Sequence, residues 1–203
     1  MGHNMYLSNS YFSICELAKT AYSLVLTKLF NRPASLIRRP VYLRGKPWIS
    51  IGKGFRTGYR CRIEAFGERG GELTRIHIGE NCHIGDSVHI SAVQEVRIGN
   101  NCLLASHIFI SDSSHGSYHG ENQDSPASPP EERDLVSAPT FIGDNVWIGE
   151  HVTVLMGARI GNGCIVGANS VVTKTFPDNC ILVGSPAKII KRFDEMSGTW
   201  RPE

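Results

Sequence analysis

Two histidines in one polar segment of this 203-residue chain have the chemistry of a general acid or base. His115 follows the run ISDSS, and His119 lies four residues further on. An imidazole has a pKa near neutral pH, so it can accept a proton from a hydroxyl group and release it again. The simpler interpretation of both is a solvated side chain in a loop rich in serine and glycine. His115 is the better candidate, because it stands where a regular pattern of the chain has just ended.

Five further histidines and one tryptophan stand at outward positions of the same pattern. The histidines are His77, His83, His89, His107 and His151. Most are interpreted most simply as polar surface residues. His83 and His89 are one repeat apart, so they would occupy neighbouring faces and could line a cleft that binds a substrate. Trp147 would be costly to expose unless its ring packs against a ligand or against another subunit. The sequence is compatible with either role for Trp147.

The pattern that positions these side chains has a period of six residues. It is clearest between residues 142 and 175, where an aliphatic residue returns at Ile142, Ile148, Val154, Ile160, Val166 and Val172. Glycine follows four of the six, and the residue four positions after each aliphatic is small or apolar. Weaker copies run from residue 49 to 63 and from residue 78 to 110, on either side of a Gly- and charge-rich excursion at residues 64–73.

A period of six fits neither an α-helix nor a simple β-strand. Each hexad offers a short extended stretch, one large inward residue and a turn made by Gly, Asn or Asp. Three such hexads close one triangular coil, and a stack of coils buries the apolar faces that one hexad cannot bury alone. The sequence therefore predicts an all-β protein, a parallel β-helix over residues 41–185 with an extruded loop at residues 111–139.

The two ends of the chain differ from the repeats. Residues 1–40 hold an apolar stripe at helical spacing that stops at Pro33, and Arg38 and Arg39 follow it. This N-terminal helical segment either braces the β-helix or lies as an amphipathic helix on an anionic membrane surface. Residues 186–203, which include AKIIKRF, are predicted to form a short C-terminal helix and tail.

The composition argues against a nucleic-acid-binding protein, a transmembrane protein and a secreted protein. Lys and Arg number 21 against 19 Asp and Glu, and no basic run alternates with aromatic residues, so we expect no nucleic acid partner. The apolar stretch between residues 11 and 30 contains three charged residues and is too polar for a transmembrane helix, and no secretory signal is visible.

The six cysteines form no CxxC pair, and four of them share one inward slot of the repeat: Cys61, Cys82, Cys102 and Cys164. We expect buried, reduced thiols in a cytoplasmic protein.

Three segments together resemble a known family. The hexads resemble those of the hexapeptide-repeat acyltransferases, whose fold is a left-handed parallel β-helix, and the resemblance covers about residues 41–192. Three runs are similar to the branch of galactoside, maltose and polysaccharide O-acetyltransferases: HGSYHGENQ, FIGDNVWIGEHVTVLMGARIGNGCIVGANSVVTK and VGSPAKIIKRF. The first run is especially similar to the loop of bacterial O-antigen and capsule acetyltransferases. That the β-helix winds in the left-handed sense is implied by the resemblance alone.

The resemblance implies a homotrimer whose active sites lie between subunits. His115 would act as general base on a sugar hydroxyl that attacks acetyl-CoA directly in a ternary complex, with no metal required. Either Asp112 or Glu121 could orient its ring. The coenzyme would contact Trp147, Gly167, Ala168, Thr173, Lys174, Lys188, Lys191 and Arg192. The sugar acceptor would contact His83, His89, His119 and Trp147.

Two residues depart from the galactoside-type pattern. Glu150 replaces a serine close to the coenzyme, and Gly85 stands where those enzymes carry an acceptor-binding asparagine. Both favour the polysaccharide branch, whose acceptor is a surface glycan or its lipid-linked precursor, with residues 1–40 at the inner face of the membrane. A nucleotide-sugar amine, a serine or a xenobiotic is an alternative acceptor. A zinc carbonic anhydrase built on His83, His115 and His119, and a non-enzymatic β-helix, fit the sequence less well.

Overall fold

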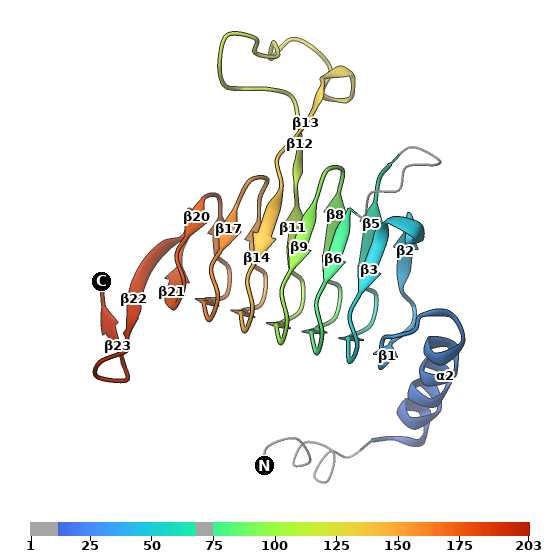
Figure 1. Ribbon diagram of the computed structural model, residues 1–203. Coiled ribbons are helices and arrows are strands. Elements are labelled where there is room, and N and C mark those ends of the chain that lie inside the picture. The colour runs from blue at the N-terminus through green and yellow to red at the C-terminus, as the bar shows by residue number, and fades with distance from the viewer. Residues whose placement is uncertain (1–11, 68–74) are drawn as a thin grey trace.

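The computed structural model describes residues 12–67 and 75–203, which form a stack of triangular coils (Figure 1). Three sheets, named A, B and C here, make the three sides, and the chain visits them in that order in each coil. Pairing between successive coils is parallel throughout the stack. This architecture confirms the predicted all-β parallel β-helix. Residues 1–11 and the end of the predicted 64–73 excursion lie outside the described residues.

Each side of the stack is built from strands of two to four residues. Sheet A contains β1 (Leu36–Ile37), β4 (Arg56–Thr57), β7 (His83–Ile84), β10 (Leu103–Leu104), β15 (Trp147–Ile148), β18 (Ile165–Val166) and β21 (Cys180–Val183). Sheet B contains β2 (Tyr42–Arg44), β5 (Arg62–Ala65), β8 (His89–Ala92), β11 (Phe109–Ser111), β16 (Thr153–Val154) and β19 (Val171–Val172). Sheet C contains β3 (Ile49–Ile51), β6 (Ile76–Ile78), β9 (Val96–Ile98), β14 (Thr140–Ile142), β17 (Arg159–Ile160) and β20 (Thr175–Phe176).

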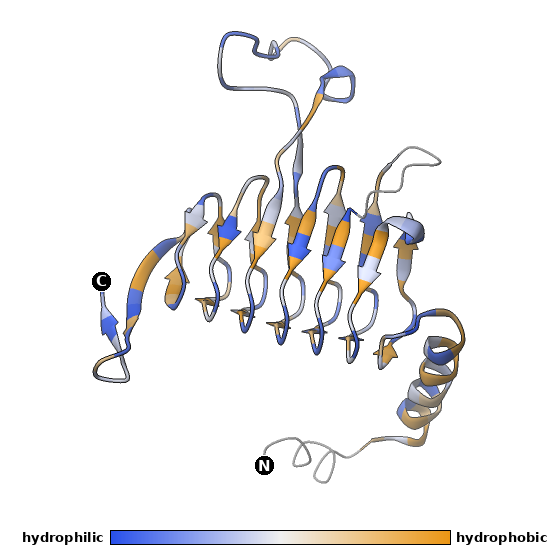
Figure 2. Ribbon diagram, in the orientation of Figure 1, coloured by the Kyte–Doolittle hydropathy of each residue, from blue (hydrophilic) through white to orange (hydrophobic). Residues whose placement is uncertain are grey.

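The hexad aliphatics form the core of the stack. Ile84, Ile90 and Ile148 are each the second residue of a short strand, and their side chains are fully buried. Figure 2 shows hydrophobic residues in the strands of every coil. The predicted inward slot is also confirmed, because Cys61, Cys82, Cys102 and Cys164 are all buried. These cysteines are free thiols, and burial raises the pKa of Cys61 and of Cys164 to about 11.

The glycine that follows a hexad aliphatic allows adjacent coils to approach closely. A Cβ on Gly99 would lie 2.6 Å from the carbonyl carbon of Gly143 in the next coil, a separation that real Cβ atoms do not show. At the same corner, the Asn100 Oδ1 accepts a hydrogen bond from the Glu80 N–H at 2.8 Å, and the Asp144 Oδ1 accepts from the Asn100 N–H at 2.6 Å. Side-chain oxygens of the next coil thus accept hydrogen bonds from backbone N–H groups at the corner, where no strand carbonyl is available.

The extruded loop leaves the stack at the corner between sheets B and C. Its two arms, β12 (Ser113–His115) and β13 (Leu135–Ser137), pair antiparallel, and a 3-10 turn, η2 (Pro130–Glu132), lies between them. The buried Asp112 anchors the base of the loop. Its carboxylate accepts hydrogen bonds from the N–H groups of residues 93, 94 and 95 at 2.6–2.9 Å. The loop is therefore fixed to the preceding coil before it projects into solvent.

The N-terminal segment contains helix α2 (Ile14–Phe30), which confirms the predicted helix. Ser13 and Glu16 form a reciprocal capping box at its start. The helix packs beside β1, whose two residues already pair with β4 of the second coil. A second 3-10 turn, η1 (Lys46–Trp48), joins β2 to β3. Among the residues that the structure describes, no helix has the length and apolar character needed to cross a bilayer.

The predicted C-terminal helix is wrong. Residues 188–194 form β22 (Lys188–Asp194), which pairs antiparallel with β21, and β23 (Thr199–Pro202) pairs antiparallel with β22. β-Branched and aromatic residues favour this extended hairpin, and the rings of Phe193 and Trp200 meet edge to face at 5.3 Å. The hairpin adds two strands to sheet A at the C-terminal end of the stack.

Replacing Asp112 with alanine should destabilise the protein. The substitution leaves three backbone donors without their acceptor, so we expect the free energy of unfolding to fall by about 3 kcal/mol. Denaturant unfolding would measure the change. Asp124→Ala is the matched control, because the Asp124 carboxylate accepts from one N–H, that of Ser117, in the outer part of the loop. Equal losses in the two variants would show that Asp112 does not anchor the loop.

Candidate functional site

His115 lies at the outer end of β12, on the arm of the extruded loop. Its backbone carbonyl accepts a hydrogen bond from the Tyr118 hydroxyl at 2.6 Å, and the Arg133 Nη1 donates to that same hydroxyl oxygen at 2.8 Å. Arg133 is held in turn by two hydrogen bonds to the carbonyl of Ser128. No pattern in the sequence singles out Tyr118 or Arg133. Together they fix the backbone that carries His115.

The imidazole of His115 is exposed, and the described residues supply no hydrogen bond or ion pair to its ring. The Asp112 carboxylate is turned to the base of the loop instead, where it accepts from the N–H groups of residues 93–95. The other predicted partner, Glu121, is exposed further along the loop, as is His119. The ring is therefore free to meet a substrate or a group from a second subunit.

The outer face of sheet A carries an exposed row that includes Trp147. Parallel register places His83, Leu103, Trp147 and Ile165 on successive coils, each about 4.8 Å from the next. The side chains of Leu103 and Trp147 are about half exposed, at 48% and 51%. This row forms a narrow apolar strip with a histidine at one end, a suitable surface for a long flexible ligand with apolar segments.

His83 carries little charge at neutral pH. Loss of solvent around the ring lowers its pKa below the ordinary value of 6.5, and the nearby positive charges of Arg56 and Arg38 lower it further. His83 also lines a shallow hollow of about 310 Å³ between helix α2 and the corner between sheets A and B. A neutral imidazole can both donate and accept a hydrogen bond, as recognition of a hydroxyl group requires.

His89 lies on a different face from His83, as the one-hexad spacing predicted. On the outer side of sheet B, its Nε2 lies 3.1 Å from the Oε2 of Glu64, and its ring lies 5.2 Å from that of Phe109. Arg62 holds the same carboxylate through two hydrogen bonds of 2.6 and 3.1 Å. The Glu64 side chain is only 8% exposed. The buried Glu64 carboxylate, shared by an arginine and a histidine, is thus held in one position on this face.

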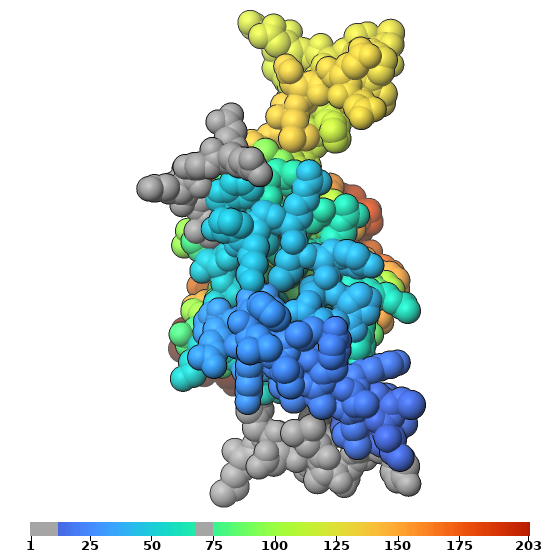
Figure 3. Space-filling view, turned by 90° about the vertical axis from the view of Figure 1, so that its right-hand side faces the viewer, coloured from blue at the N-terminus to red at the C-terminus, as the bar shows by residue number. Residues whose placement is uncertain are grey.

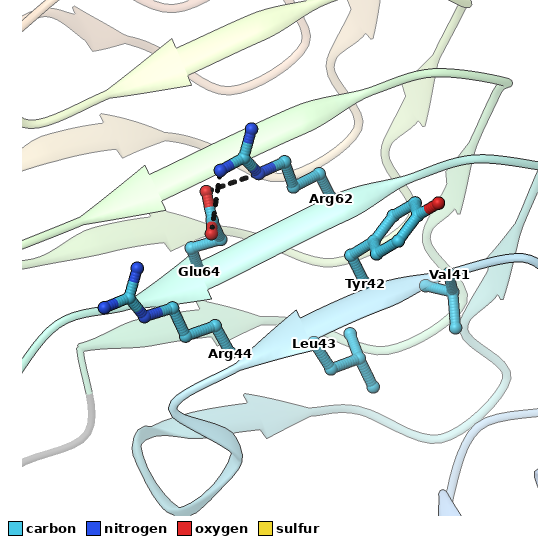
Figure 4. A pocket seen from close by; sticks show the side chains of 6 residues that line it. All are labelled: Val41, Tyr42, Leu43, Arg44, Arg62 and Glu64. Carbon is cyan, nitrogen blue, oxygen red and sulfur yellow. Dashed lines mark hydrogen bonds and ion pairs between the residues drawn. The ribbon is translucent and has the colours of Figure 1, made fainter.

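The Glu64 cluster borders an open hollow of about 550 Å³ (Figure 4). Tyr42, Arg44, Arg62 and Glu64 line it, together with the apolar Val41 and Leu43. The sequence analysis predicted His89 as a substrate contact but missed Glu64, which stands at the start of the irregular excursion. The signal that could have found it is the hexad itself, because Glu64 follows the inward Ile63 and so points outward.

The residues predicted to contact the coenzyme lie near the C-terminal end of the stack, but they do not form one groove in a single chain. Gly167 and Ala168 lie at the corner between sheets A and B, whereas Thr173 and Lys174 lie at the corner between sheets B and C. Three further residues occupy β22, between β21 and β23: Lys188, Lys191 and Arg192. All three are exposed, and the Arg192 Nε donates to the Glu203 carboxylate at 2.6 Å.

Gly85 and Glu150, which depart from the galactoside-type pattern, differ in the space around them. A Cβ on Gly85 would lie 2.7 Å from the carbonyl carbon of Ala105, so this coil has no room for the asparagine found in galactoside-type enzymes. Glu150 is exposed to solvent at the corner between sheets A and B. Among residues 12–67 and 75–203, no group of three or more His, Cys, Asp or Glu side chains is placed to hold a metal ion.

Comparison with known proteins places this architecture in a family. Residues 139–174 match the model of the bacterial transferase hexapeptide, six repeats. The chain is 41% identical over 190 residues to WbbJ, a candidate lipopolysaccharide biosynthesis O-acetyl transferase of Escherichia coli (strain K12), with 93% of this chain and 94% of WbbJ covered. The chain belongs to the hexapeptide-repeat transferase family. It is an acyltransferase, and the predicted resemblance is confirmed.

More distant relatives share parts of the chain or its fold. The galactoside O-acetyltransferase of Escherichia coli (strain K12) is 33% identical over 122 residues, which cover 60% of this chain and 56% of that enzyme. The crystal structure of AntD, an N-acyltransferase from Bacillus cereus in complex with a dTDP-amino sugar and coenzyme A, matches with a TM-score of 0.66 at 21% identity, covering 93% and 94% of the two chains. The polysialic acid O-acetyltransferase OatWY matches with a TM-score of 0.55 at 24% identity, covering 78% and 74%. The common fold is the left-handed parallel β-helix.

The surroundings of His83 can be tested by NMR titration of its imidazole. We expect the His83 pKa to lie below 6.5 in the wild-type protein and to rise in Arg56→Gln, because that substitution removes a neighbouring positive charge. His83→Gln assigns the resonance. Arg201→Gln serves as the control, since Arg201 pairs with Asp194 in the C-terminal hairpin. A His83 pKa that is unchanged by Arg56→Gln would contradict this account.

Proposed function

We propose that this acyltransferase moves the acetyl group of acetyl-CoA to a sugar hydroxyl of a surface polysaccharide or its lipid-linked precursor. The observation that carries the proposal is the free imidazole of His115 on an arm whose backbone is fixed by Tyr118 and Arg133. The 41% identity to WbbJ over nearly the whole chain supports an O-linked acceptor in glycan biosynthesis. The lack of space at Gly85 supports an acceptor site different from that of galactoside-type enzymes.

In the proposed reaction, His115 is the general base. Its imidazole takes the proton of the sugar hydroxyl as that oxygen attacks the thioester carbonyl, and a tetrahedral intermediate forms. The intermediate collapses with cleavage of the carbon–sulfur bond, and the histidine returns the proton to the departing thiolate of coenzyme A. The products are the acetyl ester and free coenzyme A. The thioester is already activated, so the step needs neither a metal nor an acyl-enzyme.

The coenzyme would lie along the exposed row on sheet A. Leu103, Trp147 and Ile165 offer an apolar strip for the pantetheine chain, and the backbone at Gly167 and Ala168 offers polar groups beside it. Further basic and hydroxyl side chains would meet the ribose and the phosphates: Thr173, Lys174, Lys188, Lys191 and Arg192. Within one chain these residues lie at two different corners of the stack and on β22, whereas His115 lies on the extruded loop. We therefore propose a homotrimer in which each active site takes His115 from one subunit and coenzyme contacts from another.

The Glu64 cluster is the proposed acceptor site. A carboxylate that is fixed by Arg62 and His89 can accept hydrogen bonds from sugar hydroxyls without losing side-chain freedom on binding, and Tyr42 offers an aromatic face beside it. His83, His119 and Trp147 are the other proposed acceptor contacts. The free, buried cysteines suit the reducing cytoplasm, where we place the enzyme.

Replacing His115 with alanine should abolish most of the acetyl transfer. General-base catalysis contributes roughly 10²–10⁴-fold, so kcat should fall by that factor, whereas binding of coenzyme A should persist. The measurement is release of free coenzyme A from acetyl-CoA with a panel of glycan, nucleotide-sugar and small hydroxyl acceptors. His119→Ala is the matched control in the same loop and should lose less than His115→Ala. If acceptor-dependent release were as fast in His115→Ala as in wild type, the mechanism would be wrong.

Replacing Glu64 with glutamine should weaken acceptor binding without affecting the coenzyme. A hydrogen bond to a charged group is worth about 1.5–3 kcal/mol, so the acceptor KM should rise roughly 10- to 100-fold. The KM for acetyl-CoA should not change. Glu80→Gln, at an exposed corner position, is the control for a lost carboxylate. A rise in both KM values in Glu64→Gln would indicate a general disturbance of the fold and not an acceptor site.

A further inference from the structure

Helix α2 faces the β-helix with its polar side and faces solvent with its apolar side. Ser23 and Thr27 are its buried residues, at 1% and 0% exposure. The Thr27 hydroxyl accepts a hydrogen bond from the Ile37 N–H at 2.8 Å, and the Ser23 hydroxyl accepts from the Arg39 N–H at 3.3 Å. A helix that only braced a core would bury its apolar stripe instead. The orientation of α2 therefore leaves that stripe for another partner.

The exposed stripe is continuous along the helix. Ile14, Val25 and Leu29 stand at helical spacing on the side opposite Ser23 and Thr27, and their exposures are 85%, 57% and 67%. Leu17 and Tyr22 extend the same surface at 55% and 59%. We call these five residues the α2 face. An apolar surface of this extent on a protein that stays in water is a typical contact site for a protein or a membrane.

From Leu17 to Ile63 the chain carries only positive charges, and the acidic residue of α2 is Glu16 in its first turn. Residues 17–63 contain 11 of the 21 Lys and Arg residues and none of the 19 Asp and Glu residues. Residues 64–203 contain 10 basic and 18 acidic residues, so the rest of the chain is net negative. The near-zero charge of the whole chain conceals this asymmetry. Figure 3 views the N-terminal end of the stack, where α2 and the first coils form the near surface.

Several of these cations border the helix itself. Lys19 and Lys28 are exposed on α2, and Arg32 follows the last turn, where its Nε donates to the carbonyl of Lys28 at 2.9 Å. The Lys46 Nζ donates to the carbonyl of Phe30 at the C-terminal end of α2. An apolar helical face bordered by Lys and Arg matches an anionic bilayer, whose acyl chains take the apolar residues and whose headgroups take the cations.

We infer that the α2 face and its surrounding cations bind the surface of an anionic membrane. A two-fold contact between copies through this face would place two net-positive ends against each other, so an anionic bilayer is the better match in charge. The binding is peripheral: the apolar side chains enter the interface while the β-helix stays in water. This inference does not depend on the acetyl transfer itself, although it would bring the Glu64 hollow, on β2 and β5 of the same end, near the surface that holds a lipid-linked acceptor.

Vesicle sedimentation with the full chain tests the inference. We expect binding to vesicles of phosphatidylcholine with phosphatidylglycerol, little binding to phosphatidylcholine alone, and release at high salt, which screens the headgroup charge. The double variant Val25→Asp, Leu29→Asp should lose at least tenfold in affinity. Lys19→Gln, Lys28→Gln should lose roughly fivefold for each cation removed. Met196→Asp, at a fully exposed position of the C-terminal hairpin, is the matched control and should bind as wild type does.

Three results would overturn the inference. They are equal binding to neutral and anionic vesicles, unchanged binding of the Val25→Asp, Leu29→Asp variant, and absence of binding by the wild type. If that variant instead lowers the molar mass of the protein in light scattering, the α2 face is a contact between copies and the membrane assignment is wrong. Coenzyme A release with a soluble acceptor should be the same in the variant and in the wild type. A failure of membrane binding is thereby separated from a failure of the transferase.

Discussion

The close stacking of coils is the constraint on which the rest of this structure depends. Every coil must repeat the path of the previous one so that strands pair in register, and the inward residues then lie on one another. Gly99 and its equivalents permit this approach, because a side chain there would collide with the next coil. Outward side chains therefore form straight rows spaced at about 4.8 Å. The row that contains His83 and Trp147, and the pair of His89 with Glu64, both follow from this spacing.

The period of six made most of the fold predictable. It identified the core residues, the inward cysteines, the position of the loop and the separation of His83 from His89 onto two faces. The C-terminal segment was mispredicted for a physical reason. AKIIKRF has apolar residues that satisfy both a helical and an extended pattern, and a neighbouring strand edge decided between them. Without β22, the edge of β21 that faces away from β18 would leave its backbone groups without partners, so tertiary pairing outweighed local preference.

The polar clusters were harder to predict, because they join residues far apart in the chain. Glu64 and His89 are 25 positions apart, and the irregular excursion between them hides their register. The anchoring role of Asp112 depends on three donors in the preceding coil, which no local pattern indicates. The role of α2 depends on which side it turns to the stack. A helical wheel predicts the stripe, but only packing shows that the hydroxyls of Ser23 and Thr27 face inward.

The two ends of the extruded loop lie side by side at its base. The Ala138 N–H donates to the carbonyl of Asp112 at 2.9 Å, and the Thr140 hydroxyl donates to the carbonyl of Ser111 at 3.1 Å. The stack closes this gap itself, so the length and sequence of the segment between these points have little effect on the coils. The loop can therefore be replaced by another segment without a change in the coils that carry it. Exchange of this loop between related proteins could alter the chemistry at the corner between sheets B and C while the stacked core remains unchanged.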